Sequence, residues 1–207
     1  MTVYHATILG GFGGQGLLFA GHVLARAAVI DGRDVSWMPS YGPEMRGGTA
    51  SCTVIMADHP IGSPIADRAD SVVALNPPSL AKFEPLLVTG GTLVVNTSLV
   101  EAESWRADVD VVPIACTRLA RAAGDDRFVS MVALGALLAR SAIVRSASVE
   151  QALAEILGDE RRALIDANLG AFHRGFDAAR EPAALASIPR PGLRSSNDSR
   201  TPHTHAR

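Results

Sequence analysis

Near the N-terminus, the residues whose spacing most clearly suggests a binding function are glycines. Gly11, Gly13 and Gly16 in the stretch "GGFGGQG" have the spacing G-x-G-x-x-G, between an apolar segment and a helical one. This spacing permits a tight turn, lets an anion approach the backbone and leaves helix N–H groups free for a phosphate. We therefore predict anion contact at the loop formed by Gly11, Gly13, Gly14, Gln15 and Gly16. The alternative is that these glycines only allow close packing of strand, helix and a neighbouring subunit.

A nicotinamide cofactor needs a further residue that this sequence does not supply. In such sites an acidic residue at the end of the second strand holds the ribose. The second predicted strand, residues 34–40, ends in Met38, Pro39 and Ser40, while Asp34 stands at its other end. Nicotinamide binding is therefore disfavoured, and contact with a phosphate or another anion stays open.

A second stretch, "PSYGPEMRGGTA", has the residue types of a recognition loop. It places Tyr41, Glu44 and Arg46 among glycines and prolines that favour turns. Arg46 beside Gly47 and Gly48 offers guanidinium and backbone donors that suit one anion. The alternative is a Glu44–Arg46 surface pair with little effect on stability. The candidate binding residues outside the glycine loop are Tyr41, Arg46, Gly47, Gly48 and Asn76.

The remaining reactive residues indicate neither a catalytic group nor a metal site. Cys52 and Cys116 form no C-x-x-C pair, and no two histidines have metal-ligand spacing with an acid. The segment Ser79–Lys82, "SLAK", matches S-x-x-K, but it falls on a predicted helix without the later motifs of that chemistry, so we interpret it as chance. Lysine is scarce, and the net charge of −2 does not indicate a nucleic-acid surface.

The elements that must position these loops alternate between strand and helix. Strands are predicted at 3–9, 34–40, 49–56, 69–76, 91–98 and 109–115, and the longer helices at 15–32, 128–141, 148–158 and 160–181. This order predicts an α/β fold, a Rossmann-like open and mainly parallel sheet with helices on both faces. The first two strands should form a right-handed βαβ unit with parallel strands. The carboxyl edge of the sheet should then carry the glycine loop, the Tyr41–Gly48 loop and Asn76.

Four local patterns predict how the helices begin, end and pack. Gly32 and Gly158 should follow helix ends. Asn76 should cap a helix that starts at Pro77. Ser148 and Gln151 have capping-box spacing. The segment 128–141 is apolar nearly all round and should be buried.

Length and composition predict one domain over residues 1–187 and a disordered Pro/Ser/Arg-rich tail over 188–207. The N-terminus lacks the features of a signal peptide, and the apolar runs are too short to cross a membrane. A cytoplasmic protein is expected, with no membrane or nucleic-acid partner.

Several segments together resemble one known family. "GFGGQGLLFAGHVLARAA", "PSYGPEMRGGTASCTVI", "IGSPIADRADSVVALNPPSL", "GGTLVVNTSLV" and "MVALGALLA" are similar, in this order, to the gamma subunit of 2-oxoacid:ferredoxin oxidoreductases over residues 5–180. The loop "YGPEMRGG" is more similar to the 2-oxoglutarate and branched-chain 2-oxoacid enzymes than to the indolepyruvate enzymes. One position departs from the family pattern, because Ser130 stands where an asparagine is common.

The resemblance implies a role in catalysis without catalytic residues in this chain. These enzymes convert a 2-oxoacid and coenzyme A into an acyl-CoA, carbon dioxide and reduced ferredoxin, and 2-oxoglutarate is the favoured substrate. Thiamine diphosphate, magnesium and iron–sulfur clusters are expected on partner subunits. Alpha and beta subunits are the expected partners, with ferredoxin or another acceptor reached through the complex. Because the chain carries no fused alpha region, it is expected to bind its partner by association.

The resemblance makes both loops candidates for the partner interface or for coenzyme A contact, and the two remain open. Two alternatives stand beside it. One is a stand-alone nucleotide- or coenzyme A-binding Rossmann-like protein, and the other is a scaffold without a ligand.

Overall fold

The computed structural model describes residues 3–41, 49–101 and 106–181. Three candidate residues, Arg46, Gly47 and Gly48, lie outside this part of the chain, as does Glu44. The predicted disordered tail, residues 188–207, lies outside it as well. Within the described ranges, no helix combines the length and apolarity needed to cross a membrane.

Six strands form one sheet in the order β2-β3-β1-β4-β5-β6. The strands are β1 (Tyr4–Phe12), β2 (Asp34–Tyr41), β3 (Thr49–Ala57), β4 (Ala69–Ala74), β5 (Leu87–Asn96) and β6 (Asp110–Ile114). The pairs β1–β4, β4–β5 and β5–β6 are parallel, whereas β3 is antiparallel to both of its neighbours. The predicted α/β fold with a mainly parallel sheet is therefore confirmed.

β1 and β2 run in the same direction, as predicted for the βαβ unit, but they are not neighbours in the sheet. β3 lies between them, with Ser51 opposite Gly10 of β1 and Cys52 opposite Pro39 of β2. The residue types explain why β3 lies beside β1 and β2 lies at the edge of the sheet. Proline lacks a backbone N–H and is tolerated in a sheet mainly at an edge, which suits β2. The apolar run in β3 is buried from Val54 to Ala57 and suits an inner strand.

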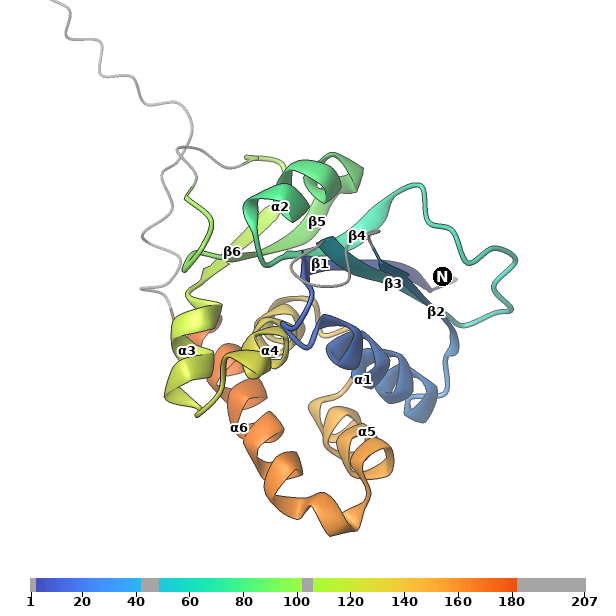
Figure 1. Cartoon of the computed structure of the whole chain (residues 1–207). Coiled ribbons are helices and arrows are strands. Elements are labelled where there is room, and N and C mark those ends of the chain that lie inside the picture. The colour runs from blue at the N-terminus through green and yellow to red at the C-terminus, as the bar shows by residue number, and fades with distance from the viewer. Residues whose placement is uncertain (1–2, 42–48, 102–105, 182–207) are drawn as a thin grey trace, which may run out of the picture.

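Helices cover both faces of the sheet, as predicted (Figure 1). The helix α2 (Pro77–Phe83) lies on one face, over a small core that includes Ile8, Val72 and Leu93. The other face carries the larger core and the remaining helices. These are α1 (Leu17–Ile30), α3 (Cys116–Ala122), α4 (Val129–Ser141), α5 (Ser146–Leu157) and α6 (Arg162–Ala178).

The helix α4 is buried from Val129 to Leu138, which confirms the expectation for residues 128–141. It lies between the sheet and α6 (Figure 1). A Cβ atom on Gly135 would overlap the carbonyl group of Phe172 in α6, and one on Gly175 would overlap that of Val132 in α4. Glycine at these two positions lets the helix backbones come into contact, so α6 completes the burial of α4.

The structure confirms the predicted glycines after two helices and corrects the predicted start of one of them. Gly32 (φ 79°) follows α1, and Gly158 (φ 79°) follows α5, as predicted. The capping box at Ser148 is wrong, because α5 already begins at Ser146 and Ser148 lies within its first turn. The carboxylate of Asp31 supplies the acceptor there. It accepts hydrogen bonds from the Arg145 backbone N–H (2.9 Å) and from the Ser148 hydroxyl.

Candidate functional site

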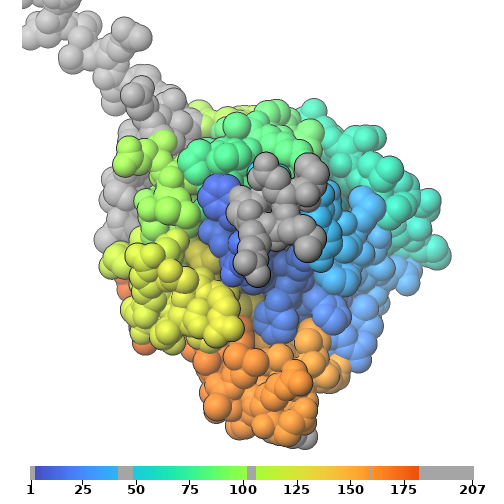
Figure 2. Space-filling view, viewed as in Figure 1, coloured from blue at the N-terminus to red at the C-terminus, as the bar shows by residue number. Residues whose placement is uncertain are grey.

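The carboxyl edge of the sheet gathers the described candidate residues, as the fold prediction required. The glycine loop follows β1, Tyr41 ends β2 and Asn76 follows β4. In the space-filling view, the blue N-terminal segment lies between green α2 and the yellow segment of α3 and α4 (Figure 2). These elements therefore share one face of the molecule.

The glycine loop is shorter than its sequence pattern suggests. β1 continues through Gly11 to Phe12, so Gly11 is a strand residue rather than the start of the turn. Only Gly13 and Gly14 are exposed at the tip, where Gly14 has a φ of 93° and open space around it. Gly16 adopts a left-handed conformation (φ 71°) immediately before α1. The exposed part of the motif is therefore the pair Gly13–Gly14.

The side chain of Gln15 folds back into the loop and uses one of its backbone donors. The Phe12 N–H donates to Oε1 of Gln15 at 2.7 Å. A Cβ atom on Gly11 would lie 2.5 Å from the same oxygen. The absent side chain at Gly11 thus makes room for Gln15. In this loop, a protein oxygen takes an N–H group that the motif would otherwise offer to a ligand.

Gly16 also makes room for protein atoms. A Cβ atom there would lie 2.6 Å from the carbonyl oxygen of Arg127, just before α4, and 3.0 Å from the hydroxyl oxygen of Ser130, in the first turn of α4. The close approach of α4 therefore depends on this glycine. For Gly11 and Gly16, the structure supports the alternative that the glycines serve internal packing.

Asn76 caps α2 as predicted. Its Oδ1 accepts a hydrogen bond from the Ser79 backbone N–H at 2.8 Å, and Pro77 is the first residue of the helix. Asn76 is fully buried, and its Nδ2 atom has no hydrogen-bond partner within the described ranges. Its oxygen therefore fixes where α2 begins, which sets the helical positions of Ser79 and Lys82.

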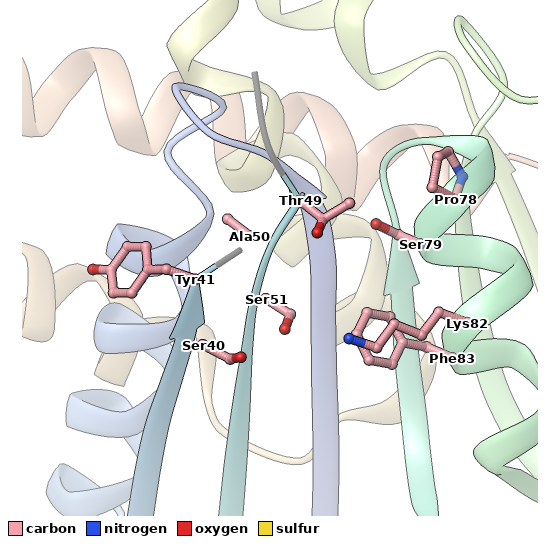
Figure 3. A pocket seen from close by; sticks show the side chains of 9 residues that line it. All are labelled: Ser40, Tyr41, Thr49, Ala50, Ser51, Pro78, Ser79, Lys82 and Phe83. Carbon is pink, nitrogen blue, oxygen red and sulfur yellow. The ribbon is translucent and has the colours of Figure 1, made fainter. Parts of the chain in front are cut away.

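A hollow with a volume of about 80 Å³ lies between α2 and the β2–β3 pair. We call it the α2 hollow. Its lining consists of residues 40–41 of β2, residues 49–51 of β3 and Pro78, Ser79, Lys82 and Phe83 of α2. Figure 3 shows the Ser79 hydroxyl and the Lys82 amine pointing from α2 toward the hydroxyl-bearing strand β3. The ring of Tyr41 turns away from α2 and is 70% exposed.

Three local features build this hollow. Ser79 and Lys82 are three residues apart on a helix, so they lie on the same face. Gly10 lets that face approach the sheet, because a Cβ atom there would lie 2.8 Å from the Cβ atom of Ser79. Ser51 is directly opposite Gly10 in the sheet. A strand residue without a side chain thus stands between two serines.

Lys82 is the only lysine of the chain. It is exposed, with Nζ 5.0 Å from the centre of the Phe83 ring, and no ion pair is found for it among the described residues. As a nucleophile motif, the S-x-x-K match of Ser79 and Lys82 is interpreted as chance. One sequence feature could have indicated this hollow. It is a single lysine that follows a serine by one helical turn, shortly after the helix cap Asn76.

A comparison with protein families decides the family of this chain. The family model for pyruvate ferredoxin/flavodoxin oxidoreductase matches residues 6–178. The chain belongs to this family. The resemblance inferred from the sequence is thereby confirmed.

Two curated relatives illustrate the similarity to members of the oxidoreductase family. The ketoisovalerate oxidoreductase subunit VorA of Methanothermobacter thermautotrophicus is 36% identical over 84% of this chain, which spans 36% of that protein. The 2-oxoglutarate synthase subunit KorC of Methanocaldococcus jannaschii is 35% identical over 84% of this chain and 92% of its own length. The chain thus spans about a third of VorA and most of KorC.

Solved structures of the oxidoreductase family agree with this fold. The gamma subunit of a keto/oxoacid ferredoxin oxidoreductase from Geobacter sulfurreducens is 30% identical, with a TM-score of 0.71 over 84% of this chain and 98% of that one. A 2-oxoglutarate:ferredoxin oxidoreductase from Magnetococcus marinus has a TM-score of 0.76 at 23% identity, over 85% of this chain and 31% of that one, and this similarity concerns the fold alone.

Ser130, the departure from the oxidoreductase family pattern, is buried in the first turn of α4. Its hydroxyl oxygen lies beside Gly16 and has no hydrogen-bond partner in the part of the chain that the structure describes. Serine therefore occupies this position as a small residue that fits against the glycine, while its hydrogen-bonding capacity is unused there.

Both cysteines of this chain are buried free thiols. Cys52 is 1% exposed and packs against Gly21 of α1, which confirms its prediction as a small buried hydrophobe. Burial raises the pKa of the Cys52 and Cys116 thiols to about 12. Across residues 3–41, 49–101 and 106–181, no group of three His, Cys, Asp or Glu side chains is arranged to hold a metal ion.

Proposed function

We propose that this chain is the gamma subunit of a thiamine-diphosphate-dependent 2-oxoacid:ferredoxin oxidoreductase. The observation that carries the proposal is the match to gamma-type chains along nearly their whole length, 92% for KorC and 98% for the Geobacter gamma subunit. Alpha and beta subunits are the proposed partners, and ferredoxin or another acceptor is reached through the complex. The chain contributes binding surface, whereas the reacting groups lie on its partners.

Three cofactors of such an enzyme are assigned to the partner subunits. Thiamine diphosphate, magnesium and iron–sulfur clusters need a diphosphate-and-metal site or several thiolate ligands. Both cysteines here are buried thiols with a raised pKa, so they do not suit cluster ligation. We therefore assign these cofactors to the alpha and beta subunits.

Coenzyme A is the cofactor that fits this chain. The similar Magnetococcus enzyme was solved with 2-oxoglutarate, coenzyme A and succinyl-CoA bound. Coenzyme A supplies the thiol that receives the acyl group, and its phosphates require cationic and hydrogen-bonding partners. The carboxyl edge of this chain offers the exposed pair Gly13–Gly14 and the donors of the α2 hollow. We propose that this edge contributes to the coenzyme A side of the complex.

The proposed 2-oxoacid is 2-oxoglutarate. Relatives named for 2-oxoglutarate match along 92–95% of their length, whereas VorA matches along 36% and the gamma subunit common to pyruvate and ketoisovalerate oxidoreductases along 85%. Identities of 35% and 36% lie too close together to discriminate between the two substrates. The residues that contact the 2-oxoacid are expected on the partner subunits, so both substrates belong in the test.

Purification of the tagged chain from its native host under anaerobic conditions tests the assignment. The chain should bring down alpha and beta subunits that carry thiamine diphosphate and iron–sulfur clusters. The complex should reduce ferredoxin in a reaction that needs both a 2-oxoacid and coenzyme A, and removal of this chain should abolish it. A chain that stays alone would overturn the proposal.

Calorimetry on the isolated chain separates this function from the stand-alone alternative. Titration with NAD, FAD and coenzyme A should give no tight nicotinamide binding. β1 lies between the antiparallel β3 and the parallel β4, and β4 is followed by Leu75 and Asn76 rather than by an acidic residue. Micromolar NAD binding would instead favour an independent nucleotide-binding protein.

A further inference from the structure

We propose that the α2 hollow binds a phosphate group, with Lys82 as its charged anchor and the hydroxyls of Ser51 and Ser79 as neutral partners. On the proposed function, on which this inference rests, the phosphate belongs to coenzyme A. The proposal moves anion recognition from the glycine motif to side chains on the opposite face of the same sheet edge.

Convergence of donors from two elements is the first observation. Ser79 and Lys82 extend from α2, and Ser51 lies across Gly10 on β3 (Figure 3). Thr49 adds a hydroxyl at the start of the same strand. A phosphate has several acceptor oxygens directed to different sides, so it suits an amine and hydroxyls that approach from separate elements.

The charge of the lining is the second observation. Lys82 is a cation, and among the described residues that line the hollow there is no carboxylate. An ammonium group is a compact point charge, and it binds phosphate without the planar geometry that arginine prefers. The Lys82 amine lies over the Phe83 ring, 5.0 Å from its centre, so one side of the amine is apolar. The hollow therefore favours one anionic group.

Size is the third observation. A volume of about 80 Å³ accommodates a few water-sized groups, and ligand pockets for whole nucleotides are several times larger. The rest of the ligand must lie outside, along the carboxyl edge or against a partner subunit. This expectation agrees with a chain that supplies only part of a binding site.

Gly10 is the residue that lets α2 come close to the sheet beside the hollow. A side chain there would lie 2.7 Å from the Phe83 ring and 2.8 Å from the Ser79 Cβ atom. Glycine at this position lets Ser79 and Phe83, which both line the hollow, come near the sheet. Gly10 is outside the G-x-G-x-x-G pattern, so its role differs from that of the motif.

The first experiment measures kinetics of the assembled complex with two variants of one residue. Lys82→Met removes the charge and keeps a linear stem over Phe83, whereas Lys82→Arg keeps a charge. The loss of a charged hydrogen bond predicts a KM for coenzyme A raised about 10- to 100-fold in Lys82→Met, with kcat unchanged. Lys82→Arg should retain most of the affinity. Arg118→Ala changes an exposed cation at the same sheet edge, outside the hollow, and should leave the KM unaltered.

Substrate analogues identify which phosphate is bound. If Lys82→Met raises the KM for coenzyme A but not for dephospho-coenzyme A, the 3′-phosphate occupies the hollow. An equal effect on both substrates assigns the diphosphate. A KM that is equal for wild type and Lys82→Met with both substrates overturns the proposal.

Because Lys82 is the only lysine, its amine can be followed directly in the unaltered complex. Limited acetylation and mass spectrometry should show that coenzyme A protects Lys82, and that pantetheine, which lacks phosphate, does not. Protection by partner assembly alone, without an effect of coenzyme A, would mean that a partner carboxylate fills the hollow and would also overturn the proposal.

The two proposals fail in different ways. A wild-type complex that does not assemble, or does not require coenzyme A, contradicts the proposed function. A wild-type complex that does both, with Lys82 unprotected by coenzyme A, contradicts only the phosphate site. The labelling result also decides the question if Lys82→Met fails to assemble.

Discussion

The glycine loop and the α2 hollow lie at the same sheet edge, and their glycines bring different protein atoms together. In the loop, the space at Gly11 and Gly16 is taken by Gln15, by the Arg127 carbonyl group and by Ser130. At Gly10, the space is taken by the Phe83 ring and by Ser79, two residues of α2 that line the hollow. In the motif that predicts anion binding, protein atoms occupy most of the space beside the glycines. The side-chain donors of the α2 hollow, in contrast, belong to no recognised binding motif. Glycine spacing predicts close approach, but it does not say which atoms approach.

Gly16 offers the largest expected effect and tests the packing side of the comparison. Gly16→Ala combines a left-handed backbone (φ 71°) with a Cβ atom 2.6 Å from the Arg127 carbonyl oxygen. Strain and overpacking together predict a loss of about 2–4 kcal/mol in the free energy of unfolding. Urea denaturation measures it. Gly14→Ala is the matched control, since its φ of 93° is also positive but open space surrounds it, and it should cost about 1 kcal/mol. Equal losses in both variants would show that Gly16 is not a packing residue.

Gly10→Ala tests whether the hollow depends on a missing side chain. The new methyl group must push Ser79 and the Phe83 ring away, so we expect the free energy of unfolding to fall by about 1–3 kcal/mol. The KM for coenzyme A should rise with it, because the same methyl group separates Ser51 from Ser79. A variant with the stability loss and an unchanged KM would remove Gly10 from the binding argument while leaving its packing role.

Asp31→Asn tests a third region, at the C-terminal end of α1. A change there can alter stability without touching the glycine loop or the α2 hollow. The carboxylate accepts hydrogen bonds from the Arg145 side chain (2.7 Å) and backbone and from Ser148. Loss of these charged hydrogen bonds should lower the free energy of unfolding by about 1–3 kcal/mol. The KM for coenzyme A should stay at its wild-type value, and a change there would mean that stability alone alters the kinetics.

The same residue gives a pH dependence with a defined sign. Burial raises the pKa of the Asp31 carboxyl, but the hydrogen bonds from Ser148 and Arg145 outweigh this, so its pKa lies below the ordinary value. A lowered pKa in the folded state contributes stability above the unfolded-state value near about 4, and that contribution is lost as the pH falls through the folded-state pKa. Urea titrations from pH 7 to pH 3 should therefore show a smaller difference between wild type and Asp31→Asn at the acidic end.

The features that the sequence predicted well are local. Asn76 before Pro77 is a cap that depends on four consecutive residues, and Gly32 and Gly158 end helices through their own backbone conformation. The α/β class also follows from the alternation of strand and helix patterns. Each of these needs only information from neighbouring residues, which a single sequence contains.

The features that the sequence could not provide depend on distant residues. β3 pairs with both β1 and β2 and so lies between them. This strand pairing places Ser51 opposite Gly10. Asp31 replaces the expected cap at Ser148 only because the end of α1 meets the start of α5. The α2 hollow requires both the pairing of β3 and the position of α2, so an S-x-x-K match alone could not indicate it.

Gln15→Ala is the smallest expected effect and the sharpest test of the comparison. The variant removes the oxygen that accepts the Phe12 N–H at 2.7 Å, in a part-buried position. A single neutral hydrogen bond at such a site is worth about 1 kcal/mol, so the free energy of unfolding should fall by that amount. The variant also frees a backbone donor at the motif. If the phosphate binds in the hollow, the KM for coenzyme A should stay unchanged in Gln15→Ala and rise in Lys82→Met. A KM that falls in Gln15→Ala would return anion recognition to the glycine loop, because the freed N–H group would then be the one that the phosphate uses.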